Sequence, residues 1–168
     1  EVEGTVRHAI GQAYYHIGKY PQSETTLKRA LEVQEKELGP EAAETLSTVH
    51  DLAAAVLAQD RNDEAVRLSR RAAEGREKVL GATHKDTLAS KSFLAYAVQL
   101  SGDLAGAEKL IREVVAAQAA TLGTSHRDTL ESRASLADVL QDLGRLAEAE
   151  TVARSMVADC IAGVGGDD

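Results

Sequence analysis

Residues 80–88 are Leu-Gly-Ala-Thr-His-Lys-Asp-Thr-Leu, and the chain repeats this stretch 42 positions later, at 122–130, as Leu-Gly-Thr-Ser-His-Arg-Asp-Thr-Leu. A weaker copy begins at Leu38-Gly39. A Leu-Ala pair follows each copy at a constant spacing, at 52–53, 94–95 and 136–137. A fixed period of this length is typical of stacked arrays, in which each unit covers the apolar face of the next. The sequence therefore predicts a repeat protein with one continuous core and an extended surface.

Each period contains two helical stripes of apolar residues. In the second period the first stripe runs from Leu46 to Val56, at steps that keep its members on one side of an α-helix. A second stripe runs from Ala65 to Leu80, after the short polar connection 59–63, and this arrangement is typical of an antiparallel helix pair. We therefore expect eight helices in four pairs, at 4–17, 21–38, 44–59, 63–80, 86–101, 105–122, 128–143 and 147–161.

The expected helix ends carry residues suited to helix termination. Three of the first helices end at a glycine that we expect to be left-handed, namely Gly18, Gly102 and Gly144. Asp60 stands at that place in the second period, where a left-handed conformation costs about 1 kcal/mol. Glycine also follows each second helix, after Leu38, Leu80 and Leu122. Asp86 and Asp128 are predicted to be the N-caps of the helices that come next.

Composition agrees with a folded helical array. Hydrophobic residues make up 43% of the 168 positions and charged residues 27%, which is unlike a disordered chain, and aromatic residues are scarce. We expect a single domain over 1–162, with repeats at about 1–39, 40–81, 82–123 and 124–162, and a disordered tail at 163–168. Because Glu3-Gly4 stands where Thr-Leu stands in later repeats, we also expect the chain to be part of a larger protein.

Charge and hydropathy exclude several partners. The net charge of −8, with basic residues interleaved among acids, argues against nucleic acid. No apolar run approaches the roughly 18 residues of a membrane span, and no signal-peptide pattern begins the chain. Cys160 is alone, which excludes an intrachain disulfide, and we expect it to be a small apolar filler in the last helix. The predicted protein is soluble and cytoplasmic.

The motif Leu-Gly-x-x-His-x-Asp-Thr-Leu, followed by Leu-Ala, then Gly102 or Gly144, then Ala-Glu at 107–108 or 149–150, resembles the 42-residue tetratricopeptide repeat of kinesin light chains. The resemblance covers nearly the whole chain. It implies an all-α, right-handed solenoid of about four helix-turn-helix units. It also implies that the first helices line a concave channel and that the second helices lie outside.

The chain departs from the family pattern at three kinds of position. Lys85 and Arg127 replace a common proline, and Ala42 stands in the first linker, where the later linkers have histidine. The family's common asparagine before Leu-Ala, which in related proteins holds a peptide backbone, is replaced by Asp51, Phe93 and Ser135.

No motif predicts catalysis, a cofactor or a metal site. The sequence contains no Gly-x-Ser-x-Gly elbow and no glycine-rich phosphate loop before a helix. His84 and His126 are one period apart, which favours a structural role beside the turn between units. His8 and His16 share a helical face with Gln12, but a metal needs three or four converging ligands.

The remaining candidate surface is the face of each first helix that the core stripe leaves over. A basic side chain of a ligand suits Asp138 and Asp142, and an apolar anchor suits Phe93 and Tyr96, although packing of Phe93 beneath the preceding unit is an equal alternative. The candidates in the three complete units are His50, Asp51, Ala54, Leu57 and Ala58; Ser92, Phe93, Tyr96, Gln99 and Leu100; and Ala134, Ser135, Asp138, Gln141 and Asp142.

These observations predict a non-catalytic protein-interaction module that binds a peptide or helical segment in the channel. Two alternatives remain. The chain could self-associate by stacking through its terminal repeats, or it could regulate an enzyme whose catalytic part lies elsewhere. We expect a monomer or a weakly self-associating protein, and loss of the partner when Phe93 and Tyr96 are replaced by alanine.

Overall fold

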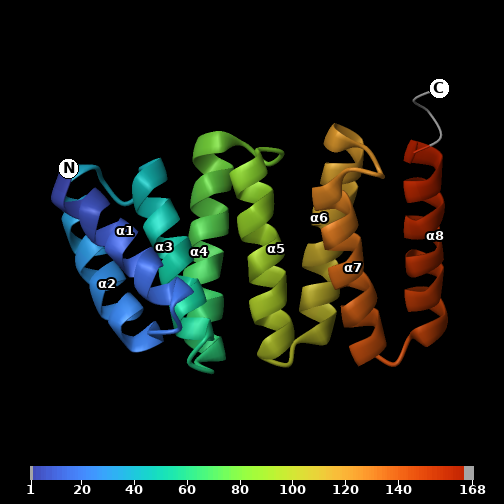
Figure 1. Ribbon diagram of the computed structural model, residues 1–168, viewed down its shortest axis with the longest axis horizontal. Coiled ribbons are helices and arrows are strands. Elements are labelled where there is room, and N and C mark those ends of the chain that lie inside the picture. Colours follow the sequence, from blue (N-terminus) through green and yellow to red (C-terminus); the bar gives the residue numbers. More distant parts are fainter. Residues whose placement is uncertain (1, 165–168) are drawn as a thin grey trace. The chain divides into compact units, whose positions relative to one another are not determined.

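The computed structural model describes residues 2–164, and within that range the chain forms eight helices and no strand (Figure 1). Their starts and ends agree with the predicted ones to within two residues, except that the last helix continues three residues further. Residues 165–168 of the predicted tail lie outside the described residues, whereas 163 and 164 belong to the last helix. The helices are α1 (Val2–His16), α2 (Tyr20–Glu37), α3 (Ala43–Leu57), α4 (Asn62–Leu80), α5 (Lys85–Leu100), α6 (Leu104–Leu122), α7 (Arg127–Asp142) and α8 (Leu146–Val164).

The helices form two compact units, 1–90 and 91–168, and the boundary falls within α5. In the first unit α1 packs on α2, α2 on α3 and α3 on α4, and α1 also contacts α3. In the second unit α7 packs on both α6 and α8 (Figure 1). Each unit thus contains successive helices in contact, as a repeat array requires. The single domain that we predicted over 1–162 stays a prediction.

Small residues let the two helices of a pair approach closely. The first helices carry Gly11, Ala53, Ala95 and Ala137 at equivalent, buried positions. At Gly11 an added Cβ would lie 2.6 Å from Cγ of Leu27, so the leucine of α2 fills the space that a side chain would need. The Ser23 hydroxyl donates to the Gly11 carbonyl at 2.8 Å across the same contact. Residue size in these positions therefore sets the helix spacing.

The turns have the backbone conformations that the glycine pattern predicts. Asp60 has φ of 60° and is the one non-glycine residue with positive φ among the described residues. The three equivalent glycines, Gly18, Gly102 and Gly144, have φ values of 73°, 94° and 74°. Asp60 therefore keeps the left-handed conformation of the equivalent glycines.

Histidine, not aspartate, caps two of the first helices. Nδ1 of His84 accepts a hydrogen bond from the Asp86 backbone N–H at 3.2 Å, and Nδ1 of His126 accepts one from the Asp128 N–H at the same distance. The prediction that Asp86 and Asp128 are N-caps is wrong, because α5 and α7 begin one residue earlier than expected and include both aspartates. The structural role predicted for the two histidines is confirmed. Ala42, which takes their place before α3, provides no side-chain cap.

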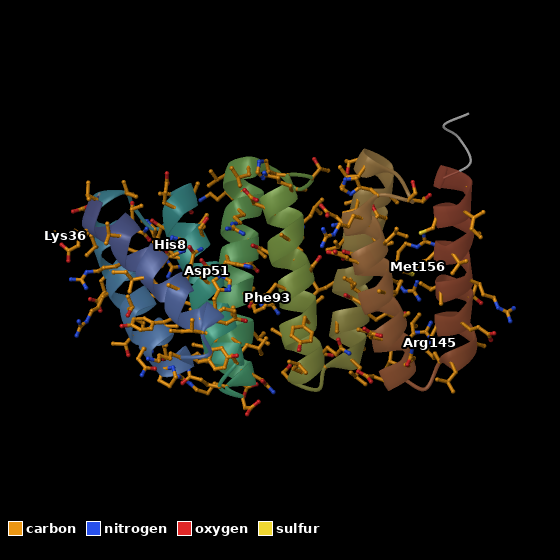
Figure 2. The ribbon with its side chains drawn as sticks, viewed as in Figure 1. His8, Lys36, Asp51, Phe93, Arg145 and Met156 are labelled. Carbon is orange, nitrogen blue, oxygen red and sulfur yellow. The ribbon has the colours of Figure 1, made fainter. Side chains whose placement is uncertain are left out.

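Cys160 does not fill the core. It lies in α8 and is exposed, so the prediction of a buried apolar filler is wrong. It lines an apolar groove between α7 and α8 together with Met156, which points from α8 toward α7 (Figure 2). Apolar character alone did not bury this residue, because no further helix of the described chain covers α8.

Candidate peptide-binding surface

In the first unit the leftover face of α3 is joined to α1 by a polar cluster around Asp51. Oδ2 of Asp51 accepts hydrogen bonds from Nε2 of His8 at 2.5 Å and from Nε2 of Gln12 at 2.8 Å. Figure 2 shows His8 and Asp51 facing each other from neighbouring helices. The carboxylate at the position of the family's common asparagine is thus engaged within the unit.

Burial and charge act in opposite directions on this cluster. Burial raises the pKa of Asp51, but the hydrogen bonds from His8 and Gln12 outweigh it and hold that pKa below its usual value. Burial lowers the pKa of His50, and the nearby charge of Arg76 lowers it further. Asp51 is therefore an ionised acceptor at neutral pH, whereas His50 favours the neutral form.

Core packing removes one predicted residue from this surface. Leu57 is only 8% exposed and belongs to the core of the first unit. His50 and Asp51 are half-buried, and Ala58 is exposed. What the first unit offers a ligand is therefore small and polar.

The second unit brings five of the predicted residues together. A cavity of about 180 Å³ lies between α5, α6 and α7, and Tyr96 beside it is 50% exposed. We call four of these five residues, Tyr96, Gln99, Ser135 and Asp138, the Tyr96 surface. The cavity is lined by Ser92, Ala95, Tyr96, Gln99, Ile111, Ser135, Asp138 and Val139.

The polar groups of this region differ in how far they are satisfied. Nε2 of Gln99 donates to Oδ2 of Asp142 at 2.6 Å, so Asp142 already has a partner. The Ser135 hydroxyl donates to the Glu131 carbonyl at 3.2 Å. Asp138 is exposed and has no hydrogen bond or ion pair with any residue in the described range. It is the carboxylate of this surface that can accept a ligand's donor without losing another bond.

The other predicted residues lie around this surface. Phe93 is half-buried in α5, and Gln141 in α7 is exposed. Leu100, at the end of α5, is 44% exposed. Half-burial of Phe93 is compatible with either predicted role, as an anchor for a ligand or as a core residue, so both stay predictions.

Sequence reasoning missed the partners His8 and Gln12. Two hydrogen bonds join one first helix to the next with the same sequence separation. His8 contacts Asp51 and Gln99 contacts Asp142, in each case 43 positions later. A separation of one residue more than the repeat period was thus the sequence signal that could have predicted these contacts. It identifies which residue of one first helix reaches the next.

Residues 2–164 contain no group of three or more His, Cys, Asp and Glu side chains placed to hold a metal ion. None of the helices in that range combines the length and apolar character needed to cross a membrane.

Comparison with known proteins identifies the repeats. The family model for the tetratricopeptide repeat matches residues 3–78, 45–120 and 86–157. A comparison with curated proteins finds no match.

Solved structures agree with this match. The crystal structure of the "Podosopora anserina putative kinesin light chain nearly identical TPR-like repeats" shares 32% sequence identity with this chain, with a TM-score of 0.84 over 92% of this chain and 73% of that one. BtubC (BKLC) from P. vanneervenii shares the fold at 14% identity, with a TM-score of 0.89 over 98% of this chain and 66% of its own. A Rap protein complexed with Competence and Sporulation Factor has 14% identity and a TM-score of 0.78, covering 94% of this chain and 42% of its own.

The predicted all-α fold class is confirmed by the helices and by these likenesses together. Together the three matches span residues 3–157 and so reach all eight helices of the described residues. The chain belongs to the tetratricopeptide repeat family, and its repeats are of the kinesin-light-chain type.

Proposed function

We propose that this chain is a non-catalytic protein-interaction module and that the Tyr96 surface binds a peptide or helical segment of a partner protein. The observation that carries the proposal is the cavity beside a half-exposed tyrosine and an unpaired carboxylate on adjacent first helices. Tyrosine provides a large apolar area at low entropic cost, and such residues are enriched among those that dominate binding energy.

The chemistry of the surface specifies the ligand segment. Asp138 can form a charge-assisted hydrogen bond with a lysine or arginine, and Tyr96 can pack against a neighbouring apolar side chain. Both residues lie in helices, α5 and α7, so their backbone is already ordered before a ligand binds. A segment with one basic and one apolar side chain close together therefore fits best.

Family and charge support a binding role of this kind. The Rap neighbour was solved in complex with Competence and Sporulation Factor, which is compatible with binding by such a fold. The net charge of −8 favours a basic ligand over a nucleic acid. A lone cysteine is compatible with a reducing compartment, and a cytoplasmic location stays a prediction.

Selection of peptides followed by mutagenesis tests the proposal. Peptides enriched from a random display library on the wild-type chain are measured by fluorescence anisotropy against Tyr96→Ala and Asp138→Asn. The proposal expects each variant to weaken binding by about tenfold, the scale of one well-placed contact. A matched control, Leu146→Ala with Glu150→Gln, removes one exposed apolar and one exposed acidic side chain from α8 and should leave affinity unchanged. Equal losses in the control would refute the Tyr96 surface as the site.

Self-association is a second candidate function that one observation favours. An apolar groove of about 480 Å³ lies between α7 and α8, and Val157 and Ile161 beside it are 60% and 69% exposed. The residues equivalent to Met156 in the earlier repeats, Ala30, Ala72 and Val114, are fully buried. A helix from another copy can cover this groove, and so can a further repeat in a longer chain. Light scattering across a dilution series separates a constant mass from one that rises with concentration.

A further inference from the structure

A groove on α4 in the first unit is not part of the surface described above. It has a volume of about 550 Å³ and lies between α4, the start of α3 and the linker that follows α2. We call it the α4 groove. It is lined by Pro40, Glu41, Leu46, Arg67, Arg70, Arg71, Glu74, Gly75 and Lys78.

The sequence builds this groove from one face of α4. Arg67, Arg70, Arg71 and Lys78 recur at steps of three, one and seven, which keeps them on one side of the helix. Gly75 hollows that side, because a Cβ there would lie 2.5 Å from Cδ2 of Leu46. A methyl group of Leu46, in α3, therefore forms the floor of the groove, in the space that a side chain at position 75 would occupy.

Two of the four cations are neutralised within the unit. Nη2 of Arg71 lies 2.5 Å from Oε1 of Glu35, and Nζ of Lys78 lies 2.5 Å from Oε1 of Glu41. Within the described part of the chain, Arg67 and Arg70 form no hydrogen bond or ion pair, and both are exposed. Glu74 lies on the same side and is exposed as well.

The unpaired state of Arg70 follows from a single departure in the repeat. The residues at its position in α2, α6 and α8 are Lys28, Arg112 and Arg154, and each pairs with a glutamate four residues earlier. In α4 the corresponding residue is Val66, which carries no charge. The helix therefore keeps the cation and lacks its usual intrahelical partner.

We propose that the α4 groove binds an acidic peptide segment of a partner protein. Four basic and two acidic side chains line it, so it is positive in a chain whose net charge is −8. Charge complementarity selects carboxylates, and the stems of the arginines and Pro40 provide an apolar wall for the peptide. The remaining negative charge of the chain repels an extended polyanion such as RNA, which favours a short acidic segment. This inference does not depend on the Tyr96 surface.

Direct binding of model peptides tests the proposal. A fluorescein-labelled peptide of alternating glutamate and alanine is titrated with the full chain at low ionic strength, and a lysine–alanine peptide serves as the opposite-charge probe. The charge-reversal variant is Arg67→Glu with Arg70→Glu. The matched control is Lys109→Glu with Arg154→Glu, which changes the charge equally at the equivalent positions of α6 and α8. Circular dichroism establishes that both variants retain helix.

The proposal expects the acidic peptide to bind wild type and control alike, and to bind the Arg67 and Arg70 variant on the order of tenfold more weakly. Arg70→Lys should keep most of the binding, because it keeps the charge. Equal binding by the charge-reversal variant and the control would overturn the proposal. So would an absence of acidic-peptide binding, or displacement of the peptide by inorganic phosphate at the concentration at which unlabelled peptide competes.

Discussion

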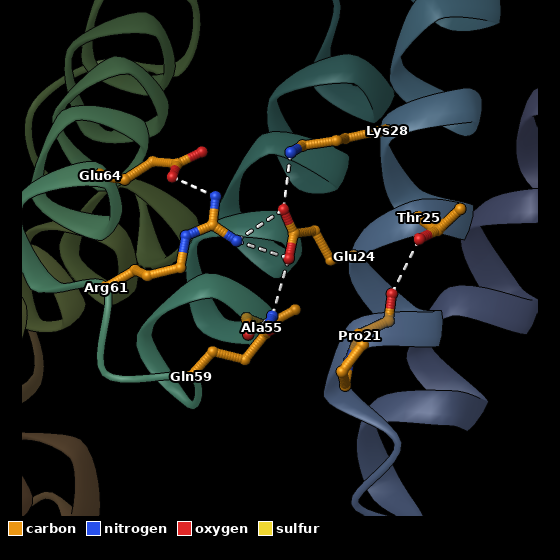
Figure 3. Close-up of polar contacts among 8 residues, drawn as sticks. All are labelled: Pro21, Glu24, Thr25, Lys28, Ala55, Gln59, Arg61 and Glu64. Atoms are coloured by element: carbon orange, nitrogen blue, oxygen red, sulfur yellow. Dashed lines mark hydrogen bonds and ion pairs between the residues drawn. The ribbon is translucent and has the colours of Figure 1, made fainter.

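Glu24 gives the sharpest test of how neighbouring repeats are held together. Its carboxylate, in α2, accepts hydrogen bonds from Nζ of Lys28 at 2.6 Å, from Nη1 of Arg61 at 2.8 Å and from Nε2 of Gln59 at 2.8 Å (Figure 3). Arg61 also pairs with Glu64. The side chain of Glu24 is only 11% exposed, so these partners replace most of its water.

The pKa of Glu24 gives the magnitude. Burial raises that pKa, but the hydrogen bonds from Lys28, Arg61 and Gln59 outweigh it and lower it from 4.5 to about 2. At about 1.4 kcal/mol for each pKa unit, this corresponds to about 3 kcal/mol of stability. Because the side chains of Lys28 and Arg61 are 48% and 41% exposed, water screens part of their interaction with Glu24. We therefore expect Glu24→Gln to lower the free energy of unfolding by about 2 kcal/mol at neutral pH.

The same difference should depend on pH in one direction. Since the folded-state pKa lies below the unfolded-state value, the contribution is complete above pH 4.5 and is lost as the pH falls toward about 2. Urea unfolding followed by circular dichroism, at a series of pH values, measures the difference in the free energy of unfolding between wild type and Glu24→Gln. That difference should shrink steadily across this window.

A surface pair provides the control. Glu131→Gln removes a carboxylate that is 62% exposed and pairs with Arg127, and it should change the free energy of unfolding by about 0.5 kcal/mol or less. A Glu24→Gln effect as small as this, or one that stays constant from neutral pH to pH 2, would show that the cluster does not stabilise the fold as argued.

Three backbone and packing changes have expected effects on the urea midpoint. Asp60→Gly should stabilise by about 1 kcal/mol, because glycine adopts the left-handed turn without strain, and Asp60→Ala should bring no such gain. Ala42→Ser should add about 1 kcal/mol by supplying the side-chain cap that α3 lacks; an unchanged midpoint would count against capping as the reason for His84 and His126. Gly11→Ala should destabilise by about 1–3 kcal/mol, since its Cβ meets buried Leu27, and a stabilising result would contradict the close packing of α1 on α2.

Periodicity predicted the helices and turns well because both depend on local sequence. The apolar stripe of α3 follows from the spacing of its apolar residues. The positive φ of Asp60 is that of the glycines at the same position in the other repeats. The caps were harder, because α5 begins one residue earlier than expected, and Asp86 then donates its backbone N–H to Nδ1 of His84 and does not itself cap the helix. Element boundaries are the least determined feature of a repeat pattern.

The candidate surface was only partly predictable because it depends on neighbouring helices. Tyr96 and Asp138 were predicted and lie beside the same cavity, whereas Leu57 was predicted on the same criterion and is buried. A helical stripe says which side a residue faces but not how closely the next helix approaches. The contact of His8 with Asp51 needs the register between two helices, which one period alone does not specify.

Hydrogen–deuterium exchange with a display-selected peptide shows most directly whether the Tyr96 surface is the binding site, because it locates the ligand on the chain. The proposed binding site predicts slower exchange on binding in α5 and α7, around Tyr96 and Asp138, with α8 unchanged. Protection confined to α6 and α8, or no protection around Tyr96 and Asp138 with saturating peptide, would contradict it.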